Sequence, residues 1–136
     1  LGIASSAKYA DLAEIYVPDV HYVPGTVVIF GGEQEITTTV KSHDSRVAGV
    51  ISTNPAYIMN AGIQATYSVE VALTGRVPCQ IKGPVQKGDR LVTSDIPGVA
   101  ERLDKIRYEP GCIIGKSLEQ YDGNDVIVIE VAVGRL

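Results

Sequence analysis

The sequence predicts an all-β fold: a compact domain of short, mostly antiparallel strands, with at most one short helix near its N-terminus. Apolar runs rich in β-branched residues recur along the chain, and turn signals with glycine, proline or asparagine separate them about every 8 to 15 residues. The 136 residues are one domain's worth, and a composition that is 45% hydrophobic can supply a core. With seven Tyr, one Phe and no Trp, that core must be mainly aliphatic.

The N-terminal stretch over residues 5–14 is the only one with helical signals. Serines stand at its start, and alanines and apolar residues recur at helical offsets. A helix of this length is marginal by itself, so an extended segment remains the alternative. We expect residues 1–20 to enter from an upstream part of a larger protein and residues 21–136 to form a single β domain. Leu1 is not a start methionine, and we expect the chain to be a fragment or a processed product.

Strand signals dominate from Tyr16 onwards. The clearest strand covers Val126–Val133, which is apolar on both faces apart from Glu130. Such a run is typical of a strand covered on both sides, so we expect a central core strand with Leu136 at the edge of the core. The other predicted strands cover residues 26–30, 35–41, 46–52, 68–77, 90–93 and 112–116.

Three arginines lie in or beside these apolar runs: Arg46, Arg76 and Arg135. Arginines in such places usually have carboxylate partners, so we expect ion pairs rather than substrate clamps. Glu130 is expected to meet Arg76 or Arg135, and Asp44, Asp89 and Asp95 are further candidate partners.

A repeated pattern has two interpretations. One unit follows Pro24-Gly25 and ends in the residues VEVALTGRV, and a second follows Lys87-Gly88 and ends in IEVAVGRL. Gly49 would then correspond to Gly115. Either the domain consists of two related β-units that share one core, or two unrelated stretches use the residues that β-proteins commonly use.

Composition and spacing argue against several kinds of site. The net charge of −4 does not suggest a nucleic-acid surface, and no apolar run reaches the length of a membrane span. His21 and His43 lack a metal-ligand spacing, so we expect no metal or other cofactor. Cys79 and Cys112 are expected to be buried free thiols.

Four phrases occur in a fixed order: ADLAE at 10–14, DSRVAGVISTNPAY at 44–57, VALTGRVP at 71–78 and KGDRLVTSDIPGVA at 87–100. With the closing IEVAVGRL they make the chain, from about residue 7 to residue 136, resemble the C-terminal domain of tailed-bacteriophage tail-fibre proteins. The resemblance implies a trimeric module at the distal end of a fibre. It implies as partners a second and third copy of the chain, the upstream fibre shaft and host surface polysaccharide. It also implies a location in the virion after assembly in the host cytoplasm.

A second resemblance concerns possible self-processing. The first phrase, followed by Gly-Val-Ile-Ser-Thr-Asn-Pro, is similar to intramolecular-chaperone domains of phage appendages, which promote trimerisation and then cleave themselves off. Aromatic residues of that motif are replaced here by Leu12 and Ile15. The resemblance would assign self-cleavage to Asp11, Glu14, Ser52 and Asn54. Read from the residues alone, these carboxylates suit a solvated surface, and residues 52–55 suit a turn. We therefore expect an attachment module without enzymatic activity, with self-cleavage as the alternative.

Overall fold

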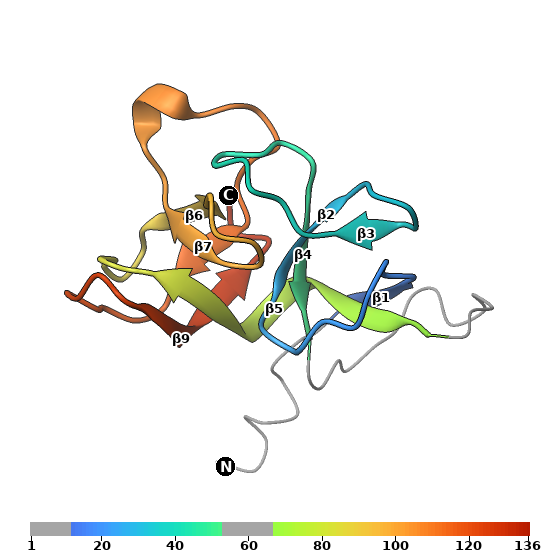
Figure 1. Cartoon of the computed structure of the whole chain (residues 1–136). Coiled ribbons are helices and arrows are strands. Elements are labelled where there is room, and N and C mark those ends of the chain that lie inside the picture. The colour runs from blue at the N-terminus through green and yellow to red at the C-terminus, as the bar shows by residue number, and fades with distance from the viewer. Residues whose placement is uncertain (1–11, 53–66) are drawn as a thin grey trace, which may run out of the picture.

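A computed structural model describes residues 12–52 and 67–136 of the chain. Over these ranges the predicted all-β fold is confirmed, and the single helical element is one turn of 3-10 helix, η1, at Lys105–Arg107 (Figure 1). The nine strands are β1 (Leu12–Tyr16), β2 (Val27–Phe30), β3 (Ile36–Thr37), β4 (Val47–Ile51), β5 (Val69–Lys82), β6 (Arg90–Thr93), β7 (Ala100–Arg102), β8 (Gly115–Ser117) and β9 (Val126–Val133).

The long strand β5 runs through both halves of the domain. Its first part pairs with β1 and β4, and its second part pairs with β9 and, at Ile81, with β7. The predicted strand ended at residue 77, yet β5 continues through Pro78 to Lys82. Proline is tolerated because the opposite residue, Glu130, directs its own N–H to Glu119 Oε2 at 2.8 Å and not to β5. The Pro78–Glu130 pair therefore requires no N–H from proline.

The second half of the domain is a closed five-stranded barrel in the order β5-β7-β6-β8-β9, with β9 returning to β5. The first half repeats this order with β1, β3, β2, β4 and the first part of β5. It closes through β1's continuation, where Pro18 bridges Ile36 in parallel, just as Ile81 pairs in parallel with Ala100. In Figure 1 the two halves lie on either side of β5, which ends the first unit and begins the second.

The registers of the two units also agree, and this supports the duplication. Val50 faces Ala72 in the first unit, and Lys116 faces Ala132 in the second. Ile15 faces Glu70, and Pro78 faces Glu130. Two unrelated stretches that merely use the same β-forming residues would not share both pairing order and register. The interpretation as two related β-units is therefore the better one.

Gly49 and Gly115 occupy equivalent, crowded positions in the two units. A Cβ atom on Gly49 would lie 2.6 Å from the carbonyl oxygen of Ala72, and one on Gly115 would lie 2.1 Å from that of Ala132. The backbones of β4 and β8 thus approach the last strand of each unit too closely for any side chain. These two glycines, which the sequence aligned, serve the same purpose.

Over the described residues the core is aliphatic, as predicted, and it forms two clusters. The larger one joins the barrel to the first unit, and the smaller one lies inside the first unit. Large side chains at the centre, such as Ile81 and Leu91, are fully buried. Cys79 and Cys112 are free and buried, as predicted.

Three expectations need correction. Residues 12–14 lie in strand β1 and not in a helix, because β5 offers them an antiparallel partner; the rest of the predicted helix lies outside the described residues. Strand β9 is central between β5 and β8, but one face of its first half is open, with Val126 45% and Val128 61% exposed. Leu136, at 74% exposure, lies outside the core.

Candidate functional site

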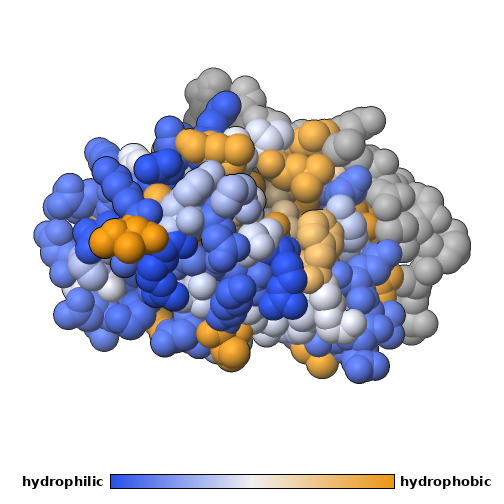
Figure 2. Space-filling model, turned by 90° about the horizontal axis from the view of Figure 1, so that it is seen from above, coloured by the Kyte–Doolittle hydropathy of each residue, from blue (hydrophilic) through white to orange (hydrophobic). Residues whose placement is uncertain are grey.

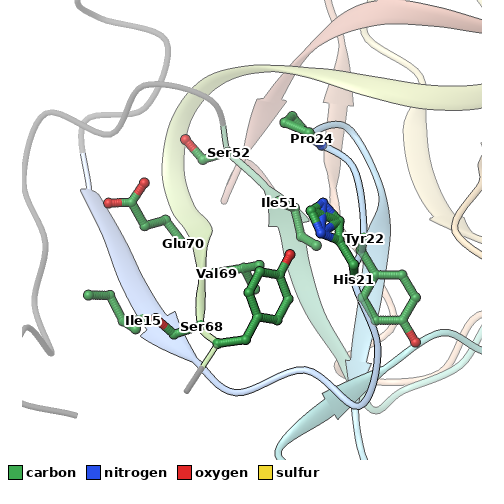
Figure 3. Close-up of a pocket in the computed structure, with 10 residues that line it drawn as sticks. Ile15, His21, Tyr22, Pro24, Ile51, Ser52, Ser68, Val69 and Glu70 are labelled. Atoms are coloured by element: carbon green, nitrogen blue, oxygen red, sulfur yellow. The ribbon is translucent and has the colours of Figure 1, made fainter. Parts of the chain in front are cut away.

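A pocket of about 400 Å³ lies at one end of the first unit (Figure 3). The end of β4, the start of β5 and the C-terminal end of β1 form one side, and the segment before β2 forms the other. Its lining residues are Ile15, His21, Tyr22, Pro24, Ile51, Ser52, Tyr67, Ser68, Val69 and Glu70.

One row of side chains crosses three strands at this pocket. Ile15 of β1 faces Glu70 of β5, and the Ser52 N–H donates to the Glu70 carbonyl oxygen at 2.8 Å. Directly paired residues point to the same face of a sheet, so Ser52, Glu70 and Ile15 belong to one face. The register therefore brings Ser52 next to Glu70, residues that are 18 positions apart in the sequence.

Glu70 is the charged residue of the pocket. Partial burial raises the pKa of its carboxyl group above the usual value. Its counterpart in the second unit, Glu130, forms an ion pair with Arg76 at 3.2 Å, as the sequence predicted. The residue equivalent to Arg76 is Ala13, and among the described residues no cation pairs with Glu70. The first unit thus keeps the carboxylate without its counter-charge.

Ser52 is the second polar group of the pocket, and its side chain is almost fully buried, at 6% exposure. Its Oγ has no hydrogen-bond partner within residues 12–52 and 67–136. A buried hydroxyl without a partner is unfavourable by about 1–3 kcal/mol, so such groups commonly mark a place where a ligand or water binds.

Aromatic rings form the opposite rim. His21 and Tyr67 stack with ring centroids 5.0 Å apart and an interplanar angle of 20°, and both side chains are exposed. A hydrogen bond holds the Tyr22 ring in place, because its hydroxyl donates to Asp19 Oδ1 at 2.5 Å. Burial acts to raise the pKa of Asp19, but hydrogen bonds from Tyr22 and Thr37 prevail and hold that pKa below its usual value. Asp19 is therefore an ionised support of the rim and not an acid or base.

The residues expected for self-cleavage are only partly described. Asp11 and Asn54 lie outside the described residues. Glu14 faces Val71 across the β1–β5 pair and accepts a hydrogen bond from the Tyr16 hydroxyl. Burial, with this hydrogen bond as the second cause, raises the pKa of Tyr16 to about 12. Successive residues of a strand alternate faces, so Glu14 lies on the face opposite Ser52. Glu70, which sequence reasoning missed, is the carboxylate beside Ser52.

A second polar cluster joins Ser42, His43, Glu101 and Asp104. His43 is buried, at 4% exposure, and has a positive φ of 60°, a conformation unusual for residues other than glycine. The Asp104 N–H donates to His43 Nε2 at 3.0 Å, so Nε2 is unprotonated and Nδ1 carries the proton. Nδ1–H then donates to Ser42 Oγ at 2.7 Å, and Ser42 donates to Glu101 Oε2 at 2.5 Å.

This order of protons bears on catalysis. A histidine that activates a serine must accept the serine proton, but here it donates to the serine. The cluster therefore connects the loop before β4 to β7 and the start of η1, and it is not a nucleophile–base pair.

The other candidate groups are structural. Asp44 is buried beside Arg46 at 2.8 Å, and the hydrogen bond from that guanidinium holds the pKa of Asp44 well below its usual range. The predicted ion pairs of Arg46 and Arg76 are confirmed, whereas Arg135 has no carboxylate partner within the described part of the chain. Burial raises the pKa of the Cys79 thiol to about 12, so it is not a reactive thiolate.

Over residues 12–52 and 67–136, no group of three or more potential ligands could hold a metal ion. In the same ranges no helix has the length and apolar character to cross a membrane. Comparisons with protein-family models, with curated proteins and with solved structures found no match.

Proposed function

We propose that this chain is a structural and host-attachment module at the distal C-terminal end of a phage tail fibre. The observation that carries the proposal is the ordered set of phrases described above, which covers nearly the whole sequence. These phrases fall on parts of the duplicated framework: the second includes β4, the third lies within β5, and the fourth spans β6 and the start of β7. The proposal therefore assigns them to the scaffold of the module.

The proposed assembly is a homotrimer continuous with an upstream fibre shaft. A closed three-fold arrangement is a stable way to end a rod. Two exposed apolar residues on β9, Val126 and Val128, offer contact area to another copy of the chain. Figure 2 shows separate apolar patches on a largely hydrophilic face, which suits contacts of limited size better than one continuous apolar surface.

The proposal can be tested by the oligomeric state and by adsorption to cells. Sedimentation equilibrium should give a trimer for the full-length fibre protein and for a fusion of this domain to its shaft. Val126→Asp with Val128→Asp should reduce the trimer population, and Val40→Asp, at a residue that is 70% exposed elsewhere, is the matched control. The labelled trimer should adsorb to susceptible bacteria and compete with the parent phage. A monomer at micromolar concentration that fails to adsorb would refute the proposal.

Self-cleavage is the second candidate, and one observation favours it. Ser52 carries a buried hydroxyl that has no partner in the described part of the chain, and it lies in the same row as Glu70, a carboxyl group of raised pKa. Intact mass measurement of the full-length protein distinguishes the candidates. Release of a C-terminal piece of about this size, abolished by Ser52→Ala and retained in Ser42→Ala, would establish self-cleavage. A single intact mass after prolonged incubation favours the attachment module.

A further inference from the structure

The pocket differs from the equivalent end of the second unit. Because the two units are related, the difference can be described position by position. In the second unit, Val85 and Tyr121 bridge the equivalent end through mutual backbone hydrogen bonds of 2.9 Å, and Val85 is fully buried. By register, the equivalent of Val85 in the first unit is Tyr22, which lines the open pocket. Within the described ranges, one end is therefore filled by Val85 and Tyr121, and the other has a pocket of about 400 Å³.

Two polar groups at the pocket, Glu70 and Ser52, lack an ion-pair or hydrogen-bond partner for their side chains among the described residues. Glu130 is paired with Arg76, but Glu70 has no cation among the described residues. Ser52 Oγ is buried without a partner among the described residues, and Ser52 lines the pocket. A carboxylate can accept several hydrogen bonds at once, and the serine hydroxyl can both donate and accept. These groups suit a ligand that carries several hydroxyl groups.

The aromatic rim suits the remaining surface of such a ligand. The exposed His21–Tyr67 stack offers flat, rigid area with polar edges, and Ile15 and Pro24 add apolar wall. A sugar ring combines one face of C–H groups with hydroxyls around its edge. The pocket volume of about 400 Å³ falls in the range that holds small ligands. The negative charge of Glu70 would repel an acidic sugar.

We infer that this pocket is a saccharide subsite that holds a neutral sugar residue, with its ring on the His21–Tyr67 side and its hydroxyls on Glu70 and Ser52. The inference rests on the proposed attachment function and assigns its recognition site to the first β-unit. The barrel, whose equivalent end is filled, takes no part in binding.

The test begins with the full chain on a printed array of bacterial surface polysaccharides and their oligosaccharide fragments. We expect binding to neutral oligosaccharides and weak or no binding to those composed of uronic acids. Titration of the ¹⁵N-labelled chain with the strongest array ligand should shift the amide signals of Ser52, Tyr67 and Glu70. Shifts confined to the barrel, or no array binding, would overturn the inference.

Variants sharpen the assignment. Glu70→Gln should weaken the affinity for that oligosaccharide about tenfold or more, because a hydrogen bond to a charged group is replaced by a weaker one. Its matched control is Glu130→Gln, the equivalent carboxyl group in the second unit, which should bind as wild type does. Tyr67→Ala should also lose affinity, and Tyr108→Ala, at an exposed tyrosine outside the pocket, should not. Tighter binding of methylammonium than of the oligosaccharide, abolished by Glu70→Gln, would identify a cation site and overturn the saccharide assignment.

Adsorption separates failure of this inference from failure of the proposed function. If the trimer adsorbs to bacteria and the Glu70 and Tyr67 variants adsorb equally well, the attachment function stands and this pocket is not its site. If oligosaccharide binding is present and adsorption is absent, the saccharide subsite stands and the attachment function falls.

Discussion

Replacing Gly115 with alanine tests the closest backbone approach in the domain. The new Cβ would lie 2.1 Å from the carbonyl oxygen of Ala132, whereas carbon–oxygen contacts are normally about 3.3 Å or longer. Strands β8 and β9 would have to separate locally by roughly 1 Å, which stretches backbone hydrogen bonds of about 2.9 Å beyond their useful range. Only three residue pairs join these strands, so little of the ladder can absorb the movement.

The expected loss of stability is about 3 kcal/mol. Two weakened hydrogen bonds account for about 2 kcal/mol, and residual overpacking for about 1 kcal/mol more. Urea denaturation measures the loss directly. With a slope of about 2 kcal/mol per molar urea, the midpoint should fall by about 1.5 M.

The duplicated architecture supplies both a parallel test and a control. Gly49→Ala should be of similar severity, because its Cβ would lie 2.6 Å from the Ala72 carbonyl oxygen and its φ is +152°. Gly88→Ala is the control: no atom lies within 4 Å of its Cβ, so only the positive φ of +85° opposes it, at about 1 kcal/mol. A midpoint for Gly115→Ala no lower than that of Gly88→Ala would refute the close approach and, with it, the equivalence of the two glycines.

Four further predictions follow from the buried polar groups. Asp44→Asn should lower stability above about pH 4 and have a smaller effect below it. A carboxyl group whose folded pKa is depressed stabilises the fold above its unfolded pKa of 3.8 and loses that contribution as pH falls. Urea midpoints measured across pH check this. Glu70→Gln should raise the neutral-pH midpoint, with the gain disappearing below the unfolded value of 4.5, because burial penalises the ionised form; a lower midpoint at pH 7 would contradict this. His43→Ala should cost about 1–3 kcal/mol, since the Asp104 N–H loses its acceptor, and a fluorophosphonate probe should leave Ser42 unlabelled. Cys79 should react with a maleimide only after unfolding, so rapid labelling of the native protein would show that this part of the core opens.

Much of the framework could be predicted from the sequence because period-2 patterning and turn residues mark strands directly. The bounds of β6 and β9 match their predictions, and β2 and β4 lie within theirs. For β1 the extended form was only the alternative to a helix, because Ala13 and Glu14 favour helices and only the edge of β5 makes the extended form favourable. The full length of β5 was missed because proline ordinarily ends a strand, and its tolerance depends on which way the opposite residue directs its N–H.

The candidate site was less accessible to sequence reasoning. Ser52 was named for its motif, but nothing local identifies Glu70, which reads as the outward-facing member of an alternating strand. Its proximity to Ser52 is a consequence of the β4–β5 register, and register depends on tertiary packing. The repeated pattern held one signal: VEVALTGRV and IEVAVGRL place Glu70 and Glu130 at the same position. That Ala13 occupies the place of Arg76, the cation beside Glu130, follows only from the strand register.

This difference explains how one duplicated fold can combine stability with recognition. The second unit closes its barrel, fills the equivalent end with Val85 and Tyr121, and neutralises Glu130 with Arg76. In the described part of the first unit, the corresponding end holds a pocket and the Glu70 carboxylate has no cation, an arrangement that costs stability by itself. Because both units share β5, the closed barrel holds the strand that positions Glu70. A rigid strand, and not a loop, thus carries the charged group of the proposed subsite, and rigid elements hold such groups with the least loss of conformational entropy on binding.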